Sequence, residues 1–311
     1  MSTVIITNCT NRKRLGNLPP VELVAAHHKS LVAMTTVWIQ QVKASVPTLP
    51  AASLYTGRSV QDAKRAAKQI SAKLMFASTG LGLVSSDHLC PAYNLTVAEE
   101  PNSIRSKLAD IGAAPSDWWD AVNDHYQRPS PIAALAQHPE VEQILVALSS
   151  SYIDLVSNDL GRIPSADLVK LRIFTSRPGV ERLPAHLKHL AMPYDERLEG
   201  SHLAGTRADF PQRALRHFVE SVMHPGDSPA LARQIVSKAM AELQPVAKVK
   251  RRRVSDAEVL SLLVNAWSDH NGSSSRLLRY LRDEALVSCE QSRFRALWLE
   301  LRKCAEYRSK A

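Results

Sequence analysis

The stretch "KLMFASTGLGLV" (residues 73–84) joins an apolar run to a polar turn that contains two glycines. A short apolar run that ends at such a turn is typical of a buried strand. An earlier run, Val4 to Thr7, has the same form, and a helical pattern over residues 59–72 lies between the two. Strand, helix and strand in this order indicate a parallel sheet, because parallel neighbours need a crossover connection.

Further elements follow from apolar spacing and proline positions. The sequence predicts helices from Pro19 until shortly before Pro47, over 115–126, over 138–160, and over 205–223 after Pro211, with strands over 167–176 and 186–195. The expected fold of residues 1–247 is therefore α/β, with a mainly parallel sheet and flanking helices.

Both N-terminal strands end in polar residues. "TNCTNRKR" (7–14) follows the first strand, and Ser78 and Thr79 follow the second. The carboxyl ends of neighbouring strands are where open α/β sheets usually bind ligands. A structural loop does not require three consecutive cations, so we expect Arg12, Lys13 and Arg14 to face a phosphate backbone.

Charge and composition narrow the functional class. The 311 residues carry a net charge of +9, which favours an acidic partner, with nucleic acid before anionic membrane. No stretch approaches the ~18 apolar residues of a membrane helix, and no secretory signal is seen. The four cysteines form no CxxC pair. We expect a cytoplasmic protein with no metal, no cofactor and no membrane partner.

A second domain is expected at residues 248–311. Five cations fall between Lys248 and Arg253, and helical segments follow over 255–270, 273–286 and 289–308. This is the outline of a helix-turn-helix-like nucleic-acid-binding module, although a protein-contact bundle has the same outline. Fourteen lysines and arginines against eight acids give this domain +6. The side chains expected to contact DNA are Lys250, Arg251, Arg252, Arg253, Arg276, Arg279, Arg293 and Arg295.

Two features of the middle segment bear on DNA. Arg213 and Arg216 are three residues apart, so they would share a helix face that grips a phosphate; a solvated face is the alternative. "DWWD" (117–120) would be either a wedge that opens a duplex or, more commonly, core packing.

Three segments together resemble the peroxide-stress YaaA proteins and their relatives: "VIITNCTNRKR" (4–14), "SLYTGRSVQDA" (53–63) and "STGLGLVSSDHLCPAYNLTV" (78–97). That group is similar to base-processing domains of archaeosine synthesis and 7-deazaguanine DNA modification, and to phage-defence DNA glycosylases. The resemblance covers about residues 1–100 and implies chemistry on a nucleic-acid base.

The positions that carry the resemblance are Asn8, Cys9, Thr10, Tyr55, Thr56, Gly57, Arg58, Ser78, Gly80, Gly82, Asp87, Pro91 and Tyr93. Thr79 departs from it, because an aromatic residue or Lys-Tyr often stands there. The resemblance implies a substrate pocket formed by Cys9, Thr10, Tyr55, Gly57, Arg58, Ser78, Thr79, Gly80, Gly82 and Tyr93.

The chemistry of individual residues suits such a pocket. A side-chain amide at Asn8 offers both a donor and an acceptor to a base edge. A carboxylate at Asp87 would stabilise the oxocarbenium-like state of N-glycosidic cleavage, so these two are the candidate catalytic residues. Tyr55 and Tyr93 would stack on a flipped base or pack in the core. Cys9 would be a thiolate among cations or, more commonly, a small buried residue.

The leading hypothesis is a DNA glycosylase that extrudes and excises a modified base, in a manner suited to defence against phage. The alternatives are a transferase or amidating enzyme on 7-deazaguanine bases, and a non-enzymatic DNA-binding stress protein. The identity of the base and the oligomeric state stay open.

Overall fold

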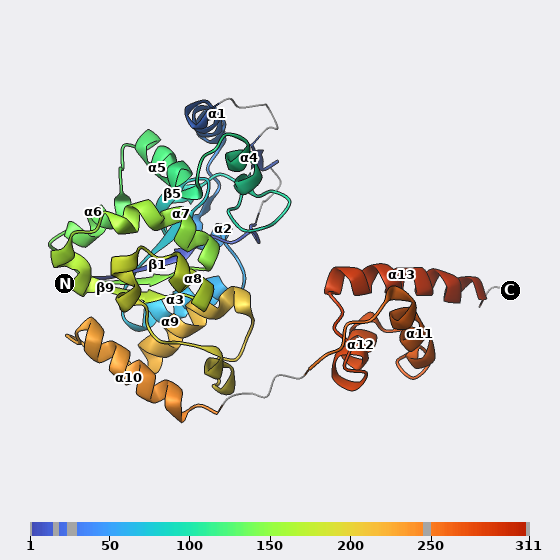
Figure 1. Cartoon of the computed structure of the whole chain (residues 1–311). Coiled ribbons are helices and arrows are strands. Elements are labelled where there is room, and N and C mark those ends of the chain that lie inside the picture. Colours follow the sequence, from blue (N-terminus) through green and yellow to red (C-terminus); the bar gives the residue numbers. More distant parts are fainter. Residues whose placement is uncertain (1, 15–18, 24–29, 245–249, 309–311) are drawn as a thin grey trace. The chain divides into compact units, whose positions relative to one another are not determined.

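The chain divides into two units, Met1–Val246 and Ala247–Ala311 (Figure 1). The computed structural model describes residues 2–14, 19–23, 30–244 and 250–308. Each unit has its own hydrophobic core, and each is described by itself.

The first unit is built on a five-stranded sheet with the order β5-β4-β1-β8-β9. Its strands are β1 (Ser2–Asn8), β4 (Lys73–Ser78), β5 (Gly82–Ser85), β8 (Val141–Ala147) and β9 (Leu171–Phe174). Four strands run parallel, and only the edge strand β5 is antiparallel to its neighbour β4. The predicted α/β class with a mainly parallel sheet is confirmed.

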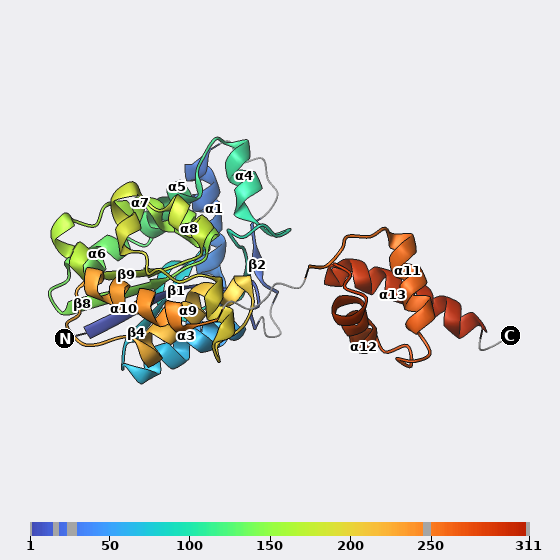
Figure 2. The ribbon, with the colours of Figure 1, turned by 60° about the horizontal axis from the view of Figure 1, so that its bottom comes forward.

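Helices cover both faces of this sheet. The helices of the first unit are α1 (Leu31–Ala44), α2 (Ala51–Leu54), α3 (Arg58–Gln69), α4 (Ile104–Asp110), α5 (Pro115–His125), α6 (Pro131–Gln137), α7 (Ser150–Gly161), α8 (Arg177–Arg182), α9 (Phe210–Ser221) and α10 (Pro229–Glu242). Figures 1 and 2 show α5, α6 and α7 on one face and α3 and α9 on the other. The buried face of α3 carries Val60, Ala63, Ala66 and Ala67, and these small residues allow close packing on the sheet and on α9.

The helix predicted over residues 138–160 is wrong in its first half, where the structure has the central strand β8. Ile144, Leu145, Val146 and Ala147 are all fully buried. A parallel strand covered on both faces has a continuous apolar run rather than an alternating pattern. Such a run cannot be distinguished from a buried helix by its periodicity.

Two other elements also differ from the prediction. The first helix begins only at Leu31, because Val21–Glu22 (β2) pairs with Tyr93–Asn94 (β7). The strand predicted over 186–195 is instead the 3-10 helix Ala185–Leu190, followed by a single bridge between Ala191 and Ile173. The remaining small sheet joins β3 (Leu49–Pro50) to β6 (Leu89–Cys90).

The order of the strands creates a switch point at β1. From β1 the chain first reaches β4 on one side, whereas the later strand β8 pairs with the other side of β1. Where connections diverge in this way, a crevice opens outside the carboxyl ends of the two strands. The carboxyl ends of β1 and β8 are therefore the favoured ligand position in this sheet.

The second unit is helical. It contains α11 (Asp256–Ala266), α12 (Ser274–Arg279) with a π-helical turn η5 (Tyr280–Glu284), and α13 (Gln291–Arg308). Its core includes Val259, Leu263, Leu277, Leu281 and Phe294. The three helical segments expected here are present, and their use in reading DNA is considered below as a proposal.

Candidate functional site

Polar side chains gather where β1 and β4 end. Thr7, Asn8, Ser78 and Thr79 are buried polar residues there, and Cys9 beside them is 1% exposed. Buried polar groups need hydrogen-bond partners, so these partners define the site. We call this group, together with Gln212 and Tyr152, the strand-end cluster.

Gln212 of α9 connects the two strands at the switch point. Its Nε2 donates to Asn8 Oδ1 at 2.8 Å, to Thr7 Oγ1 at 3.0 Å and to the Ala147 carbonyl at 2.9 Å. Its Oε1 is buried and has no hydrogen-bond partner within the part of the chain that the structure describes. An unpaired buried amide oxygen is costly, and it is a ready acceptor for an incoming N–H or O–H group.

Tyr152 of α7 lies on the other side of the cluster. Its hydroxyl shares a hydrogen bond of 3.0 Å with Cys9 Sγ and accepts one of 3.3 Å from Thr79 Oγ1. Burial, with a smaller contribution from nearby Cys9, raises the pKa of Tyr152 well above its ordinary value, so the phenol stays protonated. The sequence does not point to this residue, because it follows β8, whose apolar run predicts a helix instead of a strand.

Tyr55 and Tyr93 form a second buried chain of hydroxyls. The two hydroxyls lie 2.8 Å apart, and the Tyr93 hydroxyl is 2.7 Å from Ser78 Oγ. Both rings are 1% exposed or less, and the Tyr55 ring packs on Phe76 with centroids 5.0 Å apart. The core alternative therefore describes them, and the idea that they offer open stacking faces to a base is wrong.

The glycine turn is shaped by protein packing rather than by a ligand. A Cβ at Gly80 would lie 2.8 Å from Trp38, and a Cβ at Gly82, where φ is +70°, would lie 2.3 Å from Asn123 Oδ1. The indole of Trp38 donates to the Gly80 carbonyl at 2.7 Å, and that of Trp118 donates to the Thr79 carbonyl at 2.7 Å. This packing accounts for both glycines, their substrate contact stays a prediction, and the two tryptophans of "DWWD" pack in the core.

The cationic segment after β1 is held in place by backbone contacts. Arg14 N donates to the Leu54 carbonyl at 2.9 Å, Thr56 N donates to the Arg12 carbonyl at 2.9 Å, and Thr10 Oγ1 donates to the Thr56 carbonyl at 2.9 Å. Arg12 and Arg14 are exposed. Thr10 thus acts as a turn residue here, and the segment presents its two arginines to solvent.

Lys13 lies apart from its two neighbours. It is half-buried, and its Nζ lies 4.4 Å from the centroid of the Tyr93 ring. Burial lowers the pKa of Lys13, while nearby Cys9 and Glu100 act in the opposite direction. The expectation that Lys13 faces a phosphate beside Arg12 and Arg14 is wrong, because its amine lies over the buried tyrosine.

We expect the Lys13 amine to lose its proton at lower pH than an ordinary exposed lysine, because burial lowers its pKa. Pulse labelling with an amine-reactive ester between pH 7 and 11, followed by peptide mass spectrometry, gives a titration midpoint for Lys13, and the same labelling of the unfolded protein gives the reference. The Lys13 midpoint should be lower in the folded protein than in the unfolded protein. Since the unfolded chain then binds more protons, the free energy of unfolding should rise with pH up to the ordinary lysine pKa, relative to Lys13→Met. An equal Lys13 midpoint in the two states would contradict this placement.

Glu100 is a carboxylate in contact with this segment. Asn11 Nδ2 donates to Glu100 Oε2, and Asn102 Nδ2 donates to Asn11 Oδ1 at 2.8 Å. Glu100 also acts electrostatically on Lys13. It is exposed, so its carboxylate lies at the surface beside Asn11. The sequence pattern gave no reason to single it out.

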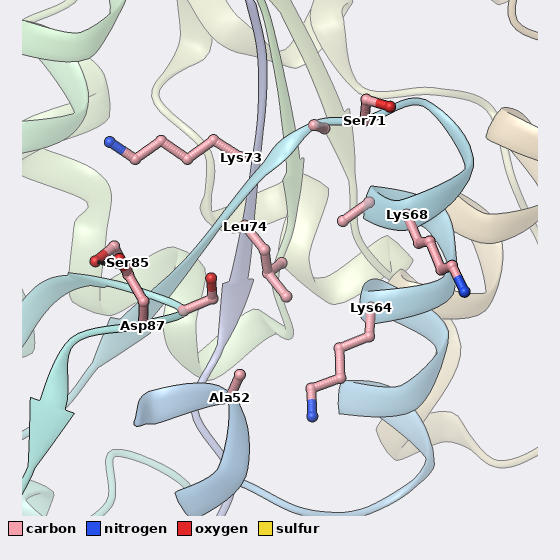
Figure 3. A pocket seen from close by; sticks show the side chains of 11 residues that line it. Ala52, Lys64, Lys68, Ser71, Lys73, Leu74, Ser85 and Asp87 are labelled. Carbon is pink, nitrogen blue, oxygen red and sulfur yellow. Dashed lines mark hydrogen bonds between the residues drawn. The ribbon is translucent and has the colours of Figure 1, made fainter. Parts of the chain in front are cut away.

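Asp87 lies at the opposite end of the sheet. Because β5 runs antiparallel to β4, its last residue, Ser85, pairs with Met75 near the start of β4. Asp87 follows there, fully exposed, and accepts a hydrogen bond of 2.5 Å from Ser85 Oγ. Figure 3 shows it near Lys73 and Leu74. The expectation that Asp87 joins Asn8 in one pocket is wrong.

Arg213 and Arg216 are structural. Arg213 is 0% exposed, and its guanidinium donates to Asp209 at 2.7 Å and to Glu199 at 2.8 Å. Arg216 donates to Asp62 at 3.0 Å and to Glu220 at 2.6 Å. The expectation that the pair grips a phosphate is wrong, because these carboxylates already occupy both guanidinium groups.

Arg58 belongs to the same ionic cluster. It begins α3 directly after Gly57, whose φ is +111°. Its Nε lies 3.6 Å from Asp62 and 3.8 Å from Asp209. Gly57 and Arg58 therefore set the start of a helix on the α9 side, and they lie outside the strand-end cluster.

The eight side chains of the second unit that were expected to contact DNA fall into two groups. Arg251, Arg252 and Arg293 pair with Asp283, Glu258 and Asp256. Others are exposed and pair with no carboxylate among the residues that the structure describes: Lys250, Arg253, Arg276, Arg279 and Arg295. The second group is the more available to an anionic partner.

Three further observations bear on the class of protein. Within the described ranges, no three His, Cys, Asp or Glu side chains come together in a way that could hold a metal ion. Among those same residues, no helix has the length and apolar character needed to span a membrane. Comparison with protein-family models, curated proteins and solved structures found no match. The YaaA resemblance therefore stays a hypothesis.

Proposed function

We propose that the chain is a DNA glycosylase. The α/β unit binds an extruded, modified base at the carboxyl ends of β1 and β8, and the helical unit binds the surrounding DNA. In the reaction, the base leaves with the bonding electrons of the N-glycosidic bond. Water supplies a hydroxyl group to C1′ and a proton to the base.

The observation that carries this proposal is the unpaired Gln212 Oε1 beside Asn8 at the switch point of the sheet. Asn8 Nδ2 donates one hydrogen to the Cys9 carbonyl at 3.0 Å, so its second N–H and a second lone pair on Oδ1 remain. An acceptor on Gln212 and a donor on Asn8 match the mixed edge of a nucleobase. Donors there also favour departure of a base that gains negative charge.

In this proposal Glu100, and not Asp87, supplies the carboxylate that stabilises the oxocarbenium-like sugar. An oxocarbenium-like sugar needs a negative charge close to the anomeric carbon. Glu100 contacts Asn11, two residues after Cys9, whereas Asp87 lies at the far end of β4. Arg12 and Arg14 would hold the phosphates that flank the extruded nucleotide.

The test is base release. The full-length protein is incubated with duplexes that carry cytosine, hydroxymethylcytosine, glucosylated cytosine or a 7-deazaguanine, and the products are resolved on alkaline gels. A glycosylase leaves alkali-labile sites in one substrate, and Asn8→Ala should reduce them. A changed nucleoside mass without strand loss would instead indicate the transferase or amidating activity. Binding without either product would leave a DNA-binding protein and overturn the proposal.

Residues 1–247 alone should fold but bind DNA more weakly. The cores of the two units share no residue, so the thermal melt of the α/β unit should be retained. Loss of the second unit removes exposed cations, and DNA affinity near 0.1 M salt should fall about tenfold or more. Circular dichroism melts and fluorescence anisotropy measure both quantities. An aggregated fragment, or one that binds DNA as tightly as the full chain, would contradict this division.

A further inference from the structure

A cavity lies at the amino end of β4, whereas the strand-end cluster lies at the carboxyl end of that strand (Figure 3). Its volume is about 670 Å³. Four segments line it: α2, the second half of α3 with the turn after it, the start of β4, and the end of β5 with the loop that follows. The floor is apolar, with Ala52, Ala67 and Leu74.

The rim of this cavity is cationic. It carries Lys64, Lys68 and Lys73 against one carboxylate, Asp87, together with the hydroxyls of Ser71, Ser85 and Ser86. Within the described residues, none of the three lysines forms an ion pair with an acid. The Asp87 carboxylate is occupied by Ser85 Oγ. This hydrogen bond lowers the pKa of Asp87 most, and Lys73 lowers it further.

The lysines do not converge on one point. Figure 3 shows Lys64 and Lys68 on α3 at one side of the cavity, with Lys73 at the other side and its amine directed away from theirs. A single small anion would need the amines gathered around it. Separate ammonium groups with intervening hydroxyls instead suit a ligand that carries phosphates at intervals.

We propose that this cavity, defined by Lys64, Lys68 and Lys73, binds the sugar-phosphate backbone of the DNA whose base enters the strand-end cluster. The inference rests on the proposed function for the identity of the ligand. The six residues of β4 separate the two sites by about 20 Å, which corresponds to about six base pairs along a duplex. The cavity would therefore contact phosphates about six base pairs from the extruded base.

The experiment compares two triple variants with the same loss of charge. One carries Lys64→Ala, Lys68→Ala and Lys73→Ala. The control carries Lys43→Ala, Lys188→Ala and Lys238→Ala, which lie outside both sites and are exposed. Affinity for a 30-base-pair duplex is measured by anisotropy from 50 to 300 mM salt, with thermal melts of both proteins. Lys68 also lies in the last turn of α3, where a cation stabilises the helix, so a change in melting alone does not report on binding.

In the cavity variant, the slope of log affinity against log salt should be less steep than in the wild type by about 2 to 3, because each phosphate contact contributes about 0.9 to it. The control variant should lose less than 1. Equal slopes in the two variants would overturn the inference about the cavity. If the wild-type protein still releases the base, the proposed function would stand in that case. A wild-type protein that does not bind DNA would overturn both. Binding of tripolyphosphate, a small anion, is measured for the same proteins. A cavity variant that loses tripolyphosphate binding but keeps wild-type DNA binding would also overturn the inference, because the cavity would then bind a small anion.

Discussion

Arg213→Met should lower the free energy of unfolding by about 3–5 kcal/mol, the usual cost of removing one partner from a buried ion pair. Its guanidinium donates to two carboxylates and also to the carbonyls of Leu203 at 2.9 Å and Thr206 at 2.7 Å. Methionine fills much of the volume, but it removes the guanidinium from Glu199 and leaves Asp209 with the longer contact of 3.8 Å to Arg58. Urea denaturation followed by tryptophan fluorescence measures the loss.

Arg177→Met is the matched control for this substitution. Arg177 also pairs with a carboxylate, Glu181, at 3.5 Å, but its side chain is 93% exposed. An exposed pair of this kind contributes about 0–1 kcal/mol. If the two variants lost equal stability, or if Arg213→Met kept its stability and lost DNA affinity, the buried structural role of Arg213 would be contradicted.

Glu100→Gln should slow single-turnover base release by about a hundred- to a thousandfold, or about 2.7–4 kcal/mol of transition-state stabilisation. The amide keeps the size and hydrogen bonding of the carboxylate but removes the charge that opposes the oxocarbenium-like sugar. DNA affinity should change little, since this interaction strengthens mainly in the transition state. Rapid-quench assays at saturating DNA give the rate directly.

Two further variants make that result specific. Glu99→Gln removes a charge from the adjacent exposed residue and should keep the wild-type rate. Asp87→Asn should also keep its single-turnover rate at saturating DNA, with any change confined to affinity. A large loss of rate in Asp87→Asn with normal release by Glu100→Gln would reverse the assignment and require a different arrangement of the sheet ends.

The N-terminal half of the sheet could be predicted from the sequence because its signals are local. Strands β1 and β4 are short apolar runs that end in polar residues, and α3 between them has a clear helical pattern. The same reasoning identified Asn8, Cys9, Ser78 and Thr79 at the carboxyl ends. It could not identify Tyr152 or Gln212, because their place depends on β8, whose continuous apolar run has no distinguishing period.

The misplacement of Asp87 has a different physical origin. A glycine turn indicates where a strand ends. It does not indicate whether the next segment forms a crossover to a parallel strand or a hairpin with an antiparallel one. Here the chain returns as β5, so each residue after Gly82 moves back toward the amino end of β4. Arg213 shows a similar limit, because the spacing of arginines on a helix does not reveal which face is buried.

The position of β1 in the middle of the sheet has a consequence for synthesis of the chain. Ser2 pairs with Val141 and Thr7 pairs with Ala147, so β1 leaves the ribosome long before its partner β8 has been made. At about 5–20 residues per second, β8 follows roughly 7–30 seconds after β1. About halfway through that interval β4 (Lys73–Ser78) becomes available on one side of β1, while the other edge of β1 stays open to pairing with foreign strands. Completion of the sheet is therefore a late event in the life of the nascent polypeptide.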